Sequence, residues 1–110
     1  MATSTYKVIG QSYPTAATAT TLYTVPSATQ TVISTINVAN QSVNADRIRV
    51  AIRPAGATLA SQHYIVYDID LPARGQYTLT AGITLGATDV VTVYSTNGTS
   101  SFNAFGSEIA

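Results

Sequence analysis

The stretch Asp46-Arg-Ile-Arg-Val-Ala-Ile-Arg53 decides the fold class, because its side chains alternate in character from one residue to the next. Ile48, Val50 and Ile52 occupy one face of the extended chain, and the arginines occupy the other. A period of two is typical of a β-strand with one face in the core and one in solvent. Pro54 ends the strand, because proline cannot donate a hydrogen bond to a neighbouring strand.

A second strand over residues 63–70 is the predicted antiparallel partner, with paired residue numbers that sum to 117. This register matches both faces at once, since a slip by one residue would turn every side chain to the wrong face. On the polar face it places Arg47 opposite Asp70 and Arg49 opposite Asp68. On the apolar face it places Ile48, Val50 and Ile52 opposite Ile69, Tyr67 and Ile65.

Strand-length segments rich in Thr, Val, Ile and Tyr recur along the rest of the chain, with turn residues between them. We expect Val32, Ile36 and Val38 to share one face of their strand. Asn97-Gly98 is typical of a two-residue hairpin turn and should join the last two strands. The pattern predicts an all-β protein, a single antiparallel β-sandwich of jelly-roll or immunoglobulin-like type with about seven or eight strands. The expected strands are 6–12, 22–25, 31–40, 46–53, 63–70, 77–81, 90–95 and 101–105.

The 110 residues suffice for one domain with its own core. Residues 1–20 are predicted to form an N-terminal strand and extended arm, because 14–21 is low in complexity and has nothing large to bury. Residues 21–110 form the β-sandwich domain in this interpretation.

Charged residues make up only 9% of the chain and the formal net charge is zero, against about 25% charged residues in ordinary globular proteins. No overall field attracts the chain to nucleic acid or to an anionic membrane. Neutral hydroxyl and amide side chains lose less entropy and hydration than Lys or Glu when an interface covers them. We therefore expect protein partners. The absence of cysteine, of a signal peptide and of a long apolar stretch favours a soluble protein made in a cytoplasm.

Four residues are candidates for partner binding. Tyr6, Tyr13 and Tyr23 lie in or near the expected arm and could form a rim that docks on a neighbour, while Arg53 has no partner carboxylate in the predicted register. The aromatic residues of the later strands are expected in the core: Tyr67, Tyr77, Phe102 and Phe105.

Residues for catalysis or metal binding are few. His63 is the only histidine, and no strained nucleophile elbow accompanies it. Asp68 and Asp70 form a pair seen in some metal sites, yet no further ligands lie nearby in the sequence. We expect no catalytic residues, no metal and no cofactor. A small hydrolase that uses His63 and Asp68 is a rival hypothesis.

Several runs together give the chain a familiar pattern from Leu22 onward. They are Leu22–Pro26, Val32–Asn40, Arg49–Gly56, His63–Asp68, Gly82–Leu85, Asp89–Tyr94 and Ser101–Ile109. This pattern resembles small virion structural proteins of tailed phages, notably phages of cyanobacteria.

The resemblance implies a non-enzymatic protein located in the virion. It implies a capsid decoration (cement) protein that binds the outer face of the major capsid protein as a homo-oligomer, such as a trimer. A neck, tail or fibre component that binds another virion protein is the alternative, including a receptor- or carbohydrate-binding module. No single functional residue is carried over from the family.

Overall fold

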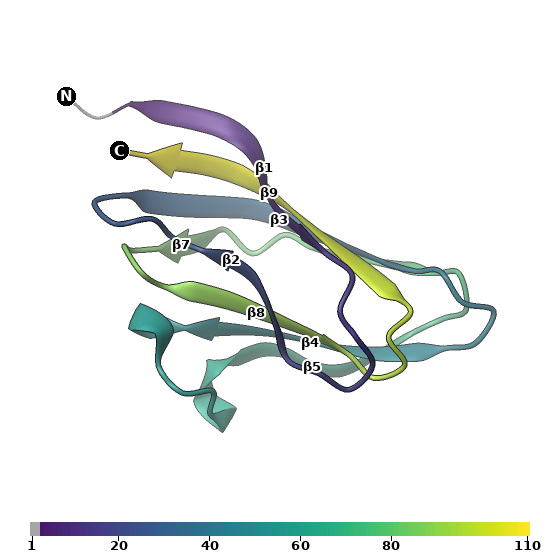
Figure 1. Cartoon of the computed structure of the whole chain (residues 1–110). Helices are drawn as coiled ribbons and strands as arrows, with labels where there is room; N and C mark the ends of the chain where they lie inside the picture. Colours follow the sequence, from purple (N-terminus) through teal and green to yellow (C-terminus); the bar gives the residue numbers. More distant parts are fainter. Residues whose placement is uncertain (1–2) are drawn as a thin grey trace.

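The chain folds into two antiparallel sheets that face each other (Figure 1). The computed structural model describes residues 3–110. Sheet one contains β1 (Ser4–Ser12), β9 (Ser100–Ile109), β3 (Gln30–Asn40), β6 (Gln76–Leu79) and β7 (Ile83–Leu85). Sheet two contains β2 (Thr20–Thr24), β8 (Val90–Ser95), β4 (Asp46–Arg53) and β5 (Tyr64–Leu71). Two 3-10 turns, η1 (Pro54–Gly56) and η2 (Ser61–His63), join β4 to β5. None of the helical segments in residues 3–110 is long and apolar enough to cross a membrane.

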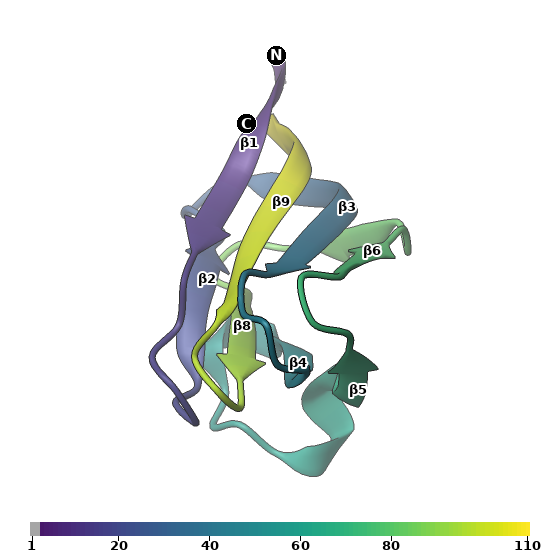
Figure 2. The ribbon, with the colours of Figure 1, turned by 90° about the vertical axis from the view of Figure 1, so that its right-hand side faces the viewer.

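The strands pair as a set of nested hairpins. The first strand pairs with the last, β2 with β8, β3 with both β6 and β7, and β4 with β5. Figure 2 shows the resulting orders, β1-β9-β3-β6 in one sheet and β2-β8-β4-β5 in the other. This nesting is the jelly-roll arrangement and differs from the immunoglobulin strand order. The predicted all-β sandwich is confirmed, and its topology is a jelly roll.

The ninth strand arises because one expected position is divided. Both β6 and β7 pair with β3, the first at residues 36–39 and the second at residues 31–33. Between them Gly82 has a φ of 59°, which favours glycine. The two short strands therefore fill the place that one strand takes in an eight-stranded jelly roll.

The core lies between the inner faces of the two sheets. Phe102 is fully buried and Tyr77 packs against the core, as predicted. Burial of each Val, Leu, Ile or Phe side chain contributes about 1.5–3 kcal/mol to folding. The largest buried apolar side chains are Phe102, Ile33, Ile36, Ile48, Leu71, Val25, Val38, Val50, Val91 and Val93.

A β-bulge at Ser34 changes which residues of β3 enter the core. The register with β9 shifts between Ile33 and Thr35, so Ile33 is buried and Val32 points outward. The prediction that Val32 shares a face with Ile36 is therefore wrong. Opposite the bulge, a Cβ on Gly106 would collide with the carbonyl oxygen of Val32, so this close approach of the two strands requires glycine.

Two further bulges lie in β5. Arg47 pairs with Asp70 and Ile48 with Ile69, as predicted, but the register then shifts at Asp68 and again at Ile65. The backbone φ of Asp68 is 53°, a left-handed conformation that Asp tolerates better than most residues. Beyond the first bulge Val66 faces the core, and Tyr67 and Ile65 are exposed. The prediction that these two face inward is wrong, because a bulge shifts one strand by one residue.

The expected N-terminal arm at residues 1–20 consists, in its described part, of an edge strand and a connector. The predicted strand at 6–12 is confirmed and begins earlier, at Ser4, and it pairs with β9 from Ser4 to Ser12. Residues 13–19 link it to β2 and are mostly exposed. Residues 1–2 of the expected arm lie outside the described residues.

The predicted hairpin at Asn97-Gly98 is wrong. The two strands that it joins belong to different sheets, β8 to sheet two and β9 to sheet one. Gly98 has a φ of 70°, as the turn signal implies, but the chain uses this freedom to cross between the sheets. The cause lies in the buried Asp46, which holds the corner in place.

The carboxylate of Asp46 accepts four hydrogen bonds from three segments. Oδ2 accepts from the hydroxyls of Ser95 at 2.5 Å and Ser100 at 2.6 Å, and Oδ1 accepts from the backbone N–H of Asn97 at 2.9 Å and of Arg47 at 2.8 Å. Burial opposes ionisation of this carboxyl, but the hydrogen bonds outweigh it and hold its pKa below the ordinary range. An ionised carboxylate therefore ties the start of β4 to the end of β8 and the start of β9.

Replacing Asp46 with Asn should lower the free energy of unfolding at pH 7 by about 2–3 kcal/mol, because an amide cannot accept all four bonds. Since folding lowers the pKa of Asp46, its contribution is present above the unfolded-state pKa and is lost as pH falls through the folded-state value. Urea unfolding between pH 2.5 and 7 measures both effects. As the pH falls, the free energy of unfolding should decrease less steeply in Asp46→Asn than in wild type. An equal pH dependence of both proteins would contradict this role.

A buried hydroxyl offers a second test of the packing. Among residues 3–110, the Thr92 Oγ1 is the one buried side-chain polar atom without a hydrogen-bond partner. Thr92→Val removes this unpaired group at nearly constant volume, so stability should rise by about 1 kcal/mol. The control is Thr21→Val, since Thr21 pairs with Thr92 but is exposed. Thermal unfolding should show a higher Tm for Thr92→Val only, and a lower Tm would refute the argument.

Candidate interaction surface

Charged side chains are distributed unequally over the two sheets. The five strands of sheet one contain two of them, Lys7 and Glu108, which pair with each other at 3.0 Å. Glu108 also accepts a hydrogen bond from Tyr23 of β2, so the pair lies on the inner side, at the rim of the sandwich. The other charged residues lie in sheet two or in loops. Every side chain that points outward from sheet one is therefore uncharged.

We call this outward side the uncharged face. A row of amides crosses it, because Gln11, Asn103 and Asn37 are paired on the neighbouring strands β1, β9 and β3. Gln11 donates to Asn103 at 2.7 Å and Asn37 donates to Gln76 of β6 at 3.1 Å. The main side chains of the face are Ser4, Tyr6, Val8, Gln11, Val32, Thr35, Asn37, Gln76, Thr78, Thr84, Asn103, Phe105 and Ser107.

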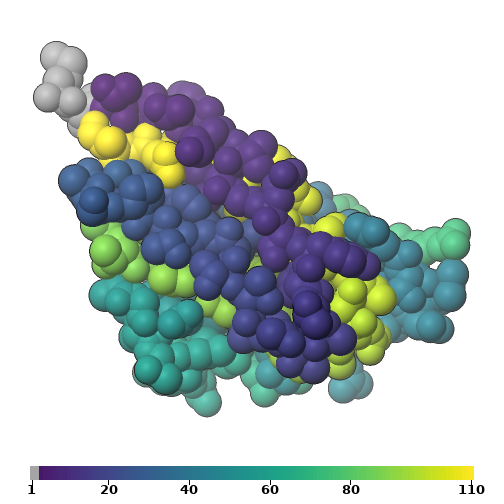
Figure 3. Space-filling model, in the orientation of Figure 1, coloured from purple at the N-terminus to yellow at the C-terminus, as the bar shows by residue number. Residues whose placement is uncertain are grey.

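Apolar side chains gather at one end of the uncharged face. Val8 and Phe105 are directly opposite each other in the β1–β9 pair and are 47% and 40% exposed. Tyr6, two residues before Val8, is 85% exposed. In the space-filling view β1 lies open along the upper border of the molecule, with β9 beside it (Figure 3). Exposed aromatic and aliphatic groups among neutral polar ones are typical of protein–protein interfaces.

Tyr13 lies at the other end of β1, just beyond its last residue. It is 58% exposed and lines a shallow hollow of about 370 Å³ together with Gln11 and Asn103 of the amide row. Two of the four sequence-predicted contact residues, Tyr6 and Tyr13, are thus exposed near opposite ends of the same edge strand.

Tyr23 is less exposed than Tyr6 and Tyr13, because it is partly buried and bonded within its own chain. Its ring packs against the core, and its hydroxyl donates to Glu108 at 2.5 Å and lies 2.8 Å from the Thr31 hydroxyl. Burial and the hydrogen bond to Glu108 raise the pKa of Tyr23 to about 12. The hydrogen bonds from Tyr23 and Lys7 lower the pKa of Glu108. Tyr23 therefore links the two sheets at the rim.

Arg53 makes hydrogen bonds to two backbone carbonyl groups. Its Nε donates to the carbonyl oxygen of Ala57 at 2.7 Å and its Nη2 donates to that of Gly56 at 3.1 Å. The guanidinium thus closes the η1 loop. As the predicted register implied, no carboxylate in residues 3–110 pairs with Arg53. Its guanidinium instead binds the backbone of the loop that follows β4.

Phe105 was expected in the core and lies instead on the uncharged face. Phe102 and Ala104 point inward, so residue 105, three positions after Phe102, falls on the opposite side of the strand. The separation of three residues between Phe102 and Phe105 can be read from the sequence. The strand order that brings Val8 beside Phe105 cannot, and for that reason the sequence did not predict this apolar group.

The outward side of sheet two carries a cluster of charges and aromatic rings around Arg49. Arg49 binds Asp68 with two hydrogen bonds, from Nε at 2.6 Å and from Nη2 at 3.2 Å. Its guanidinium also lies 4.3 Å from the ring centres of Tyr67 and Tyr94. The hydrogen bonds to Asp68 raise the pKa of Arg49, and those from Arg49 lower the pKa of Asp68. Arg47 binds Asp70 at 3.0 Å, so both predicted ion pairs are confirmed.

The residues of the rival hydrolase hypothesis serve the local fold. His63 is buried, and its Nδ1 accepts a hydrogen bond from the backbone N–H of Ala60 at 3.0 Å within the η2 turn. The Asp68 carboxylate is bound by Arg49. Within residues 3–110, no three His, Asp or Glu side chains gather where they could hold a metal ion.

Comparisons with known proteins give a structural match and no family. No protein-family model matches the chain, and no curated protein is similar in sequence. A chain in the solved structure of infectious bursal disease virus, Gx strain, matches with a TM-score of 0.48 and 16% sequence identity. The match covers 99% of this chain and 31% of the viral chain. The resemblance to tailed-phage virion proteins stays a prediction from the sequence.

Replacing Tyr23 with Phe should lower the free energy of unfolding by about 1–2 kcal/mol, because Glu108 and Thr31 lose a partly buried hydrogen-bond partner. Since folding raises the pKa of Tyr23, its contribution is present below the unfolded-state value of about 10 and is lost as pH rises toward 12. Guanidinium unfolding at pH 7 and pH 11 measures this. The exposed Tyr6→Phe is the control, and equal stability of both variants at pH 7 would contradict the assignment.

Proposed function

We propose that the protein is a non-enzymatic structural component of a virus particle, which binds other virion proteins through the uncharged face. The observation that carries the proposal is the absence of charge from the outward side of sheet one, combined with the exposed Tyr6, Val8 and Phe105. The whole-chain resemblance to tailed-phage virion proteins supports the same class. The jelly roll is also common among viral capsid proteins, although a fold alone does not establish function.

Desolvation favours this face as a docking surface. Hydroxyl and amide groups lose less hydration than ionised groups when a partner covers them, and the amide row is already cross-linked by hydrogen bonds. The partner must then satisfy only the remaining donors and acceptors. Tyr6 and Phe105 supply large apolar surfaces that typically dominate binding energy.

The available area suits a specific interface. A standard interface buries about 800 Å² on each partner, which is roughly a seventh of the 5714 Å² accessible surface of this chain. One side of a sandwich that measures 49 by 27 Å provides this area. On a symmetric particle, repeated modest contacts add up to strong retention.

Within this class, the finer proposal is a capsid decoration protein that stabilises the shell by bridging copies of the major capsid protein, itself a homo-oligomer such as a trimer. A place in the neck, tail or fibre is the alternative. Both roles would use the uncharged face, so they differ only in where the protein lies in the particle.

The test is sedimentation of the purified chain with purified virions, or with major-capsid-protein shells, of the phage that encodes it. Tyr6→Ala and Phe105→Ala should each weaken binding about 10- to 30-fold, equivalent to about 1.4–2 kcal/mol. Arg47→Ala on sheet two is the matched control and should bind like wild type, because its exposed ion pair contributes little. Cryo-electron microscopy of the particle would then locate the chain and count its copies.

Two results would overturn the proposal. One is the absence of the chain from purified virions by mass spectrometry. The other is binding that depends on Arg47 and is unaffected by Tyr6→Ala and Phe105→Ala.

A further inference from the structure

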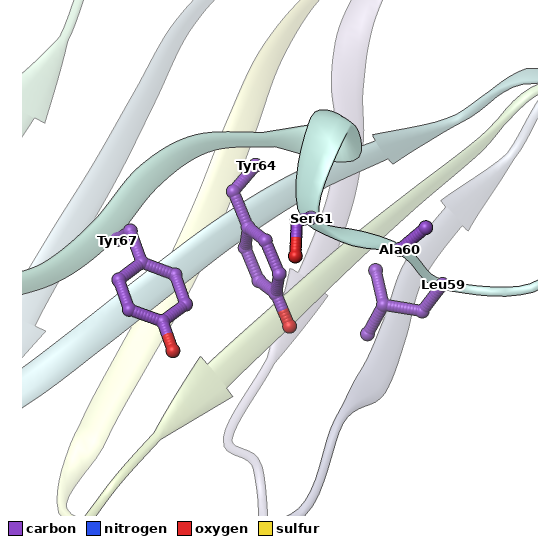
Figure 4. A pocket seen from close by; sticks show the side chains of 5 residues that line it. All are labelled: Leu59, Ala60, Ser61, Tyr64 and Tyr67. Atoms are coloured by element: carbon purple, nitrogen blue, oxygen red, sulfur yellow. The ribbon is translucent and has the colours of Figure 1, made fainter.

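A second surface lies on sheet two and has no role in the proposed function. A hollow of about 590 Å³ opens beside β5, within the range of about 300–1,000 Å³ typical of small-molecule sites. The connection between β4 and β5 forms one side and two tyrosines form the other (Figure 4). The lining residues are Leu59, Ala60, Ser61, Tyr64 and Tyr67.

The exposure of Tyr67 results from the backbone rather than from chance. In a regular strand its ring would enter the core, and the bulge at Asp68, with its φ of 53°, turns it outward. The ring is 60% exposed as a result. Bulges of this kind often lie beside functional sites, where they redirect a side chain.

The Tyr67 ring is held in one orientation before any ligand arrives. The Arg49 guanidinium lies 4.3 Å from its centre, and the Tyr64 ring meets it edge to face, with centres 4.9 Å apart and an angle of 79°. Arg49 is itself held by Asp68 and by Tyr94. A fixed aromatic ring loses little conformational entropy when a ligand stacks on it.

The cation beside the hollow is already paired, which favours a neutral ligand. The Arg49 guanidinium lies against Tyr67 and binds Asp68, so a phosphate or carboxylate would first have to displace that carboxylate. This argues against nucleotides and acidic ligands. A cation would likewise compete with an arginine.

Hydroxyl groups lie beside the exposed ring. In Figure 4 the hydroxyl ends of Tyr64 and Tyr67 point to the same side, and Ser61 lies beside Tyr64. Each of these hydroxyl groups can donate one hydrogen bond and accept others, so they can bind the hydroxyls of a ligand.

We propose that this hollow binds a neutral saccharide, with the C–H face of a pyranose ring on Tyr67 and its hydroxyls toward Ser61 and the hydroxyl of Tyr64. A pyranose has an apolar face and a rim of hydroxyl groups. The apolar face matches the Tyr67 ring, and the hydroxyl groups match the polar groups beside it. A proline-rich peptide also stacks on tyrosines, but the two rings here are nearly perpendicular rather than arranged along a groove. The site lies on the sheet opposite the uncharged face, so it would stay open while that face is docked.

The experiment uses the full chain and a panel of neutral methyl pyranosides (gluco, galacto, manno and N-acetylglucosamine) with their di- and trisaccharides. Saturation-transfer NMR detects binding, and titration of ¹⁵N-labelled protein gives the Kd. We expect at least one neutral sugar to bind and to shift amides of η2 and β5. Tyr67→Ala should weaken that binding at least tenfold without lowering Tm, because its ring is mostly exposed.

Tyr13→Ala is the matched control, since Tyr13 is similarly exposed but lies beyond β1, at the edge of sheet one, and its Kd should equal that of wild type. The proposal is overturned if no neutral sugar in the panel binds at millimolar concentration, or if Tyr67→Ala binds as tightly as wild type. It is also overturned if a polyproline peptide binds at Tyr67 and the sugars do not. None of these outcomes depends on virion binding, so this inference and the proposed function fail independently.

Discussion

The jelly roll depends on how the chain passes between its two sheets, and the Asp46 carboxylate governs the corner at which β8 leads into β9. A two-residue turn at Asn97-Gly98 would fold these strands into one sheet. Instead, Asp46 binds Ser95 at the end of one strand and Ser100 at the start of the other. Satisfying a buried carboxylate needs donors from several segments, since an unpaired buried charge is costly. The nested pairing of β1 with β9 therefore rests on a polar group inside the sandwich.

The two outer faces of the sandwich differ in their content of charged residues. The ion pairs of Arg47 and Arg49 are both placed on sheet two, and Lys7 and Glu108 pair at the rim. Sheet one is left with hydroxyl, amide and apolar side chains alone on its outward side. A chain with so few charges uses nearly all of them within itself, so association with partners must come from burial and hydrogen bonding. This distribution supports a docking role for sheet one and leaves sheet two free to bear a different kind of site.

Local alternation in the sequence predicted the strands and the fold class well, because burial of one face forces a period of two. It predicted the pairing of Arg47 with Asp70 and of Arg49 with Asp68, since charge and hydrophobicity agreed on one register. It failed where a bulge intervened. Val32 and Tyr67 both turned outward after shifts at Ser34 and Asp68, and neither residue carries a strong bulge signal. The hydrogen bond from Tyr23 to Glu108 was not predicted, because it joins two strands that are distant in the sequence.

The Asp68 bulge shows how a local irregularity and an ion pair support each other. After the register shift Arg49 lies opposite Tyr67 rather than Asp68, yet the left-handed backbone of Asp68 returns its carboxylate to the guanidinium at 2.6 Å. The arginine thus keeps its counter-charge and gains an aromatic neighbour, and the tyrosine gains a charged group that holds its ring. Regular pairing would have satisfied the arginine and buried the tyrosine. The bulge makes the ion pair compatible with an exposed, oriented ring. As a result, β5 presents an aromatic side chain to solvent, while its irregular backbone is poorly suited to pair with another strand.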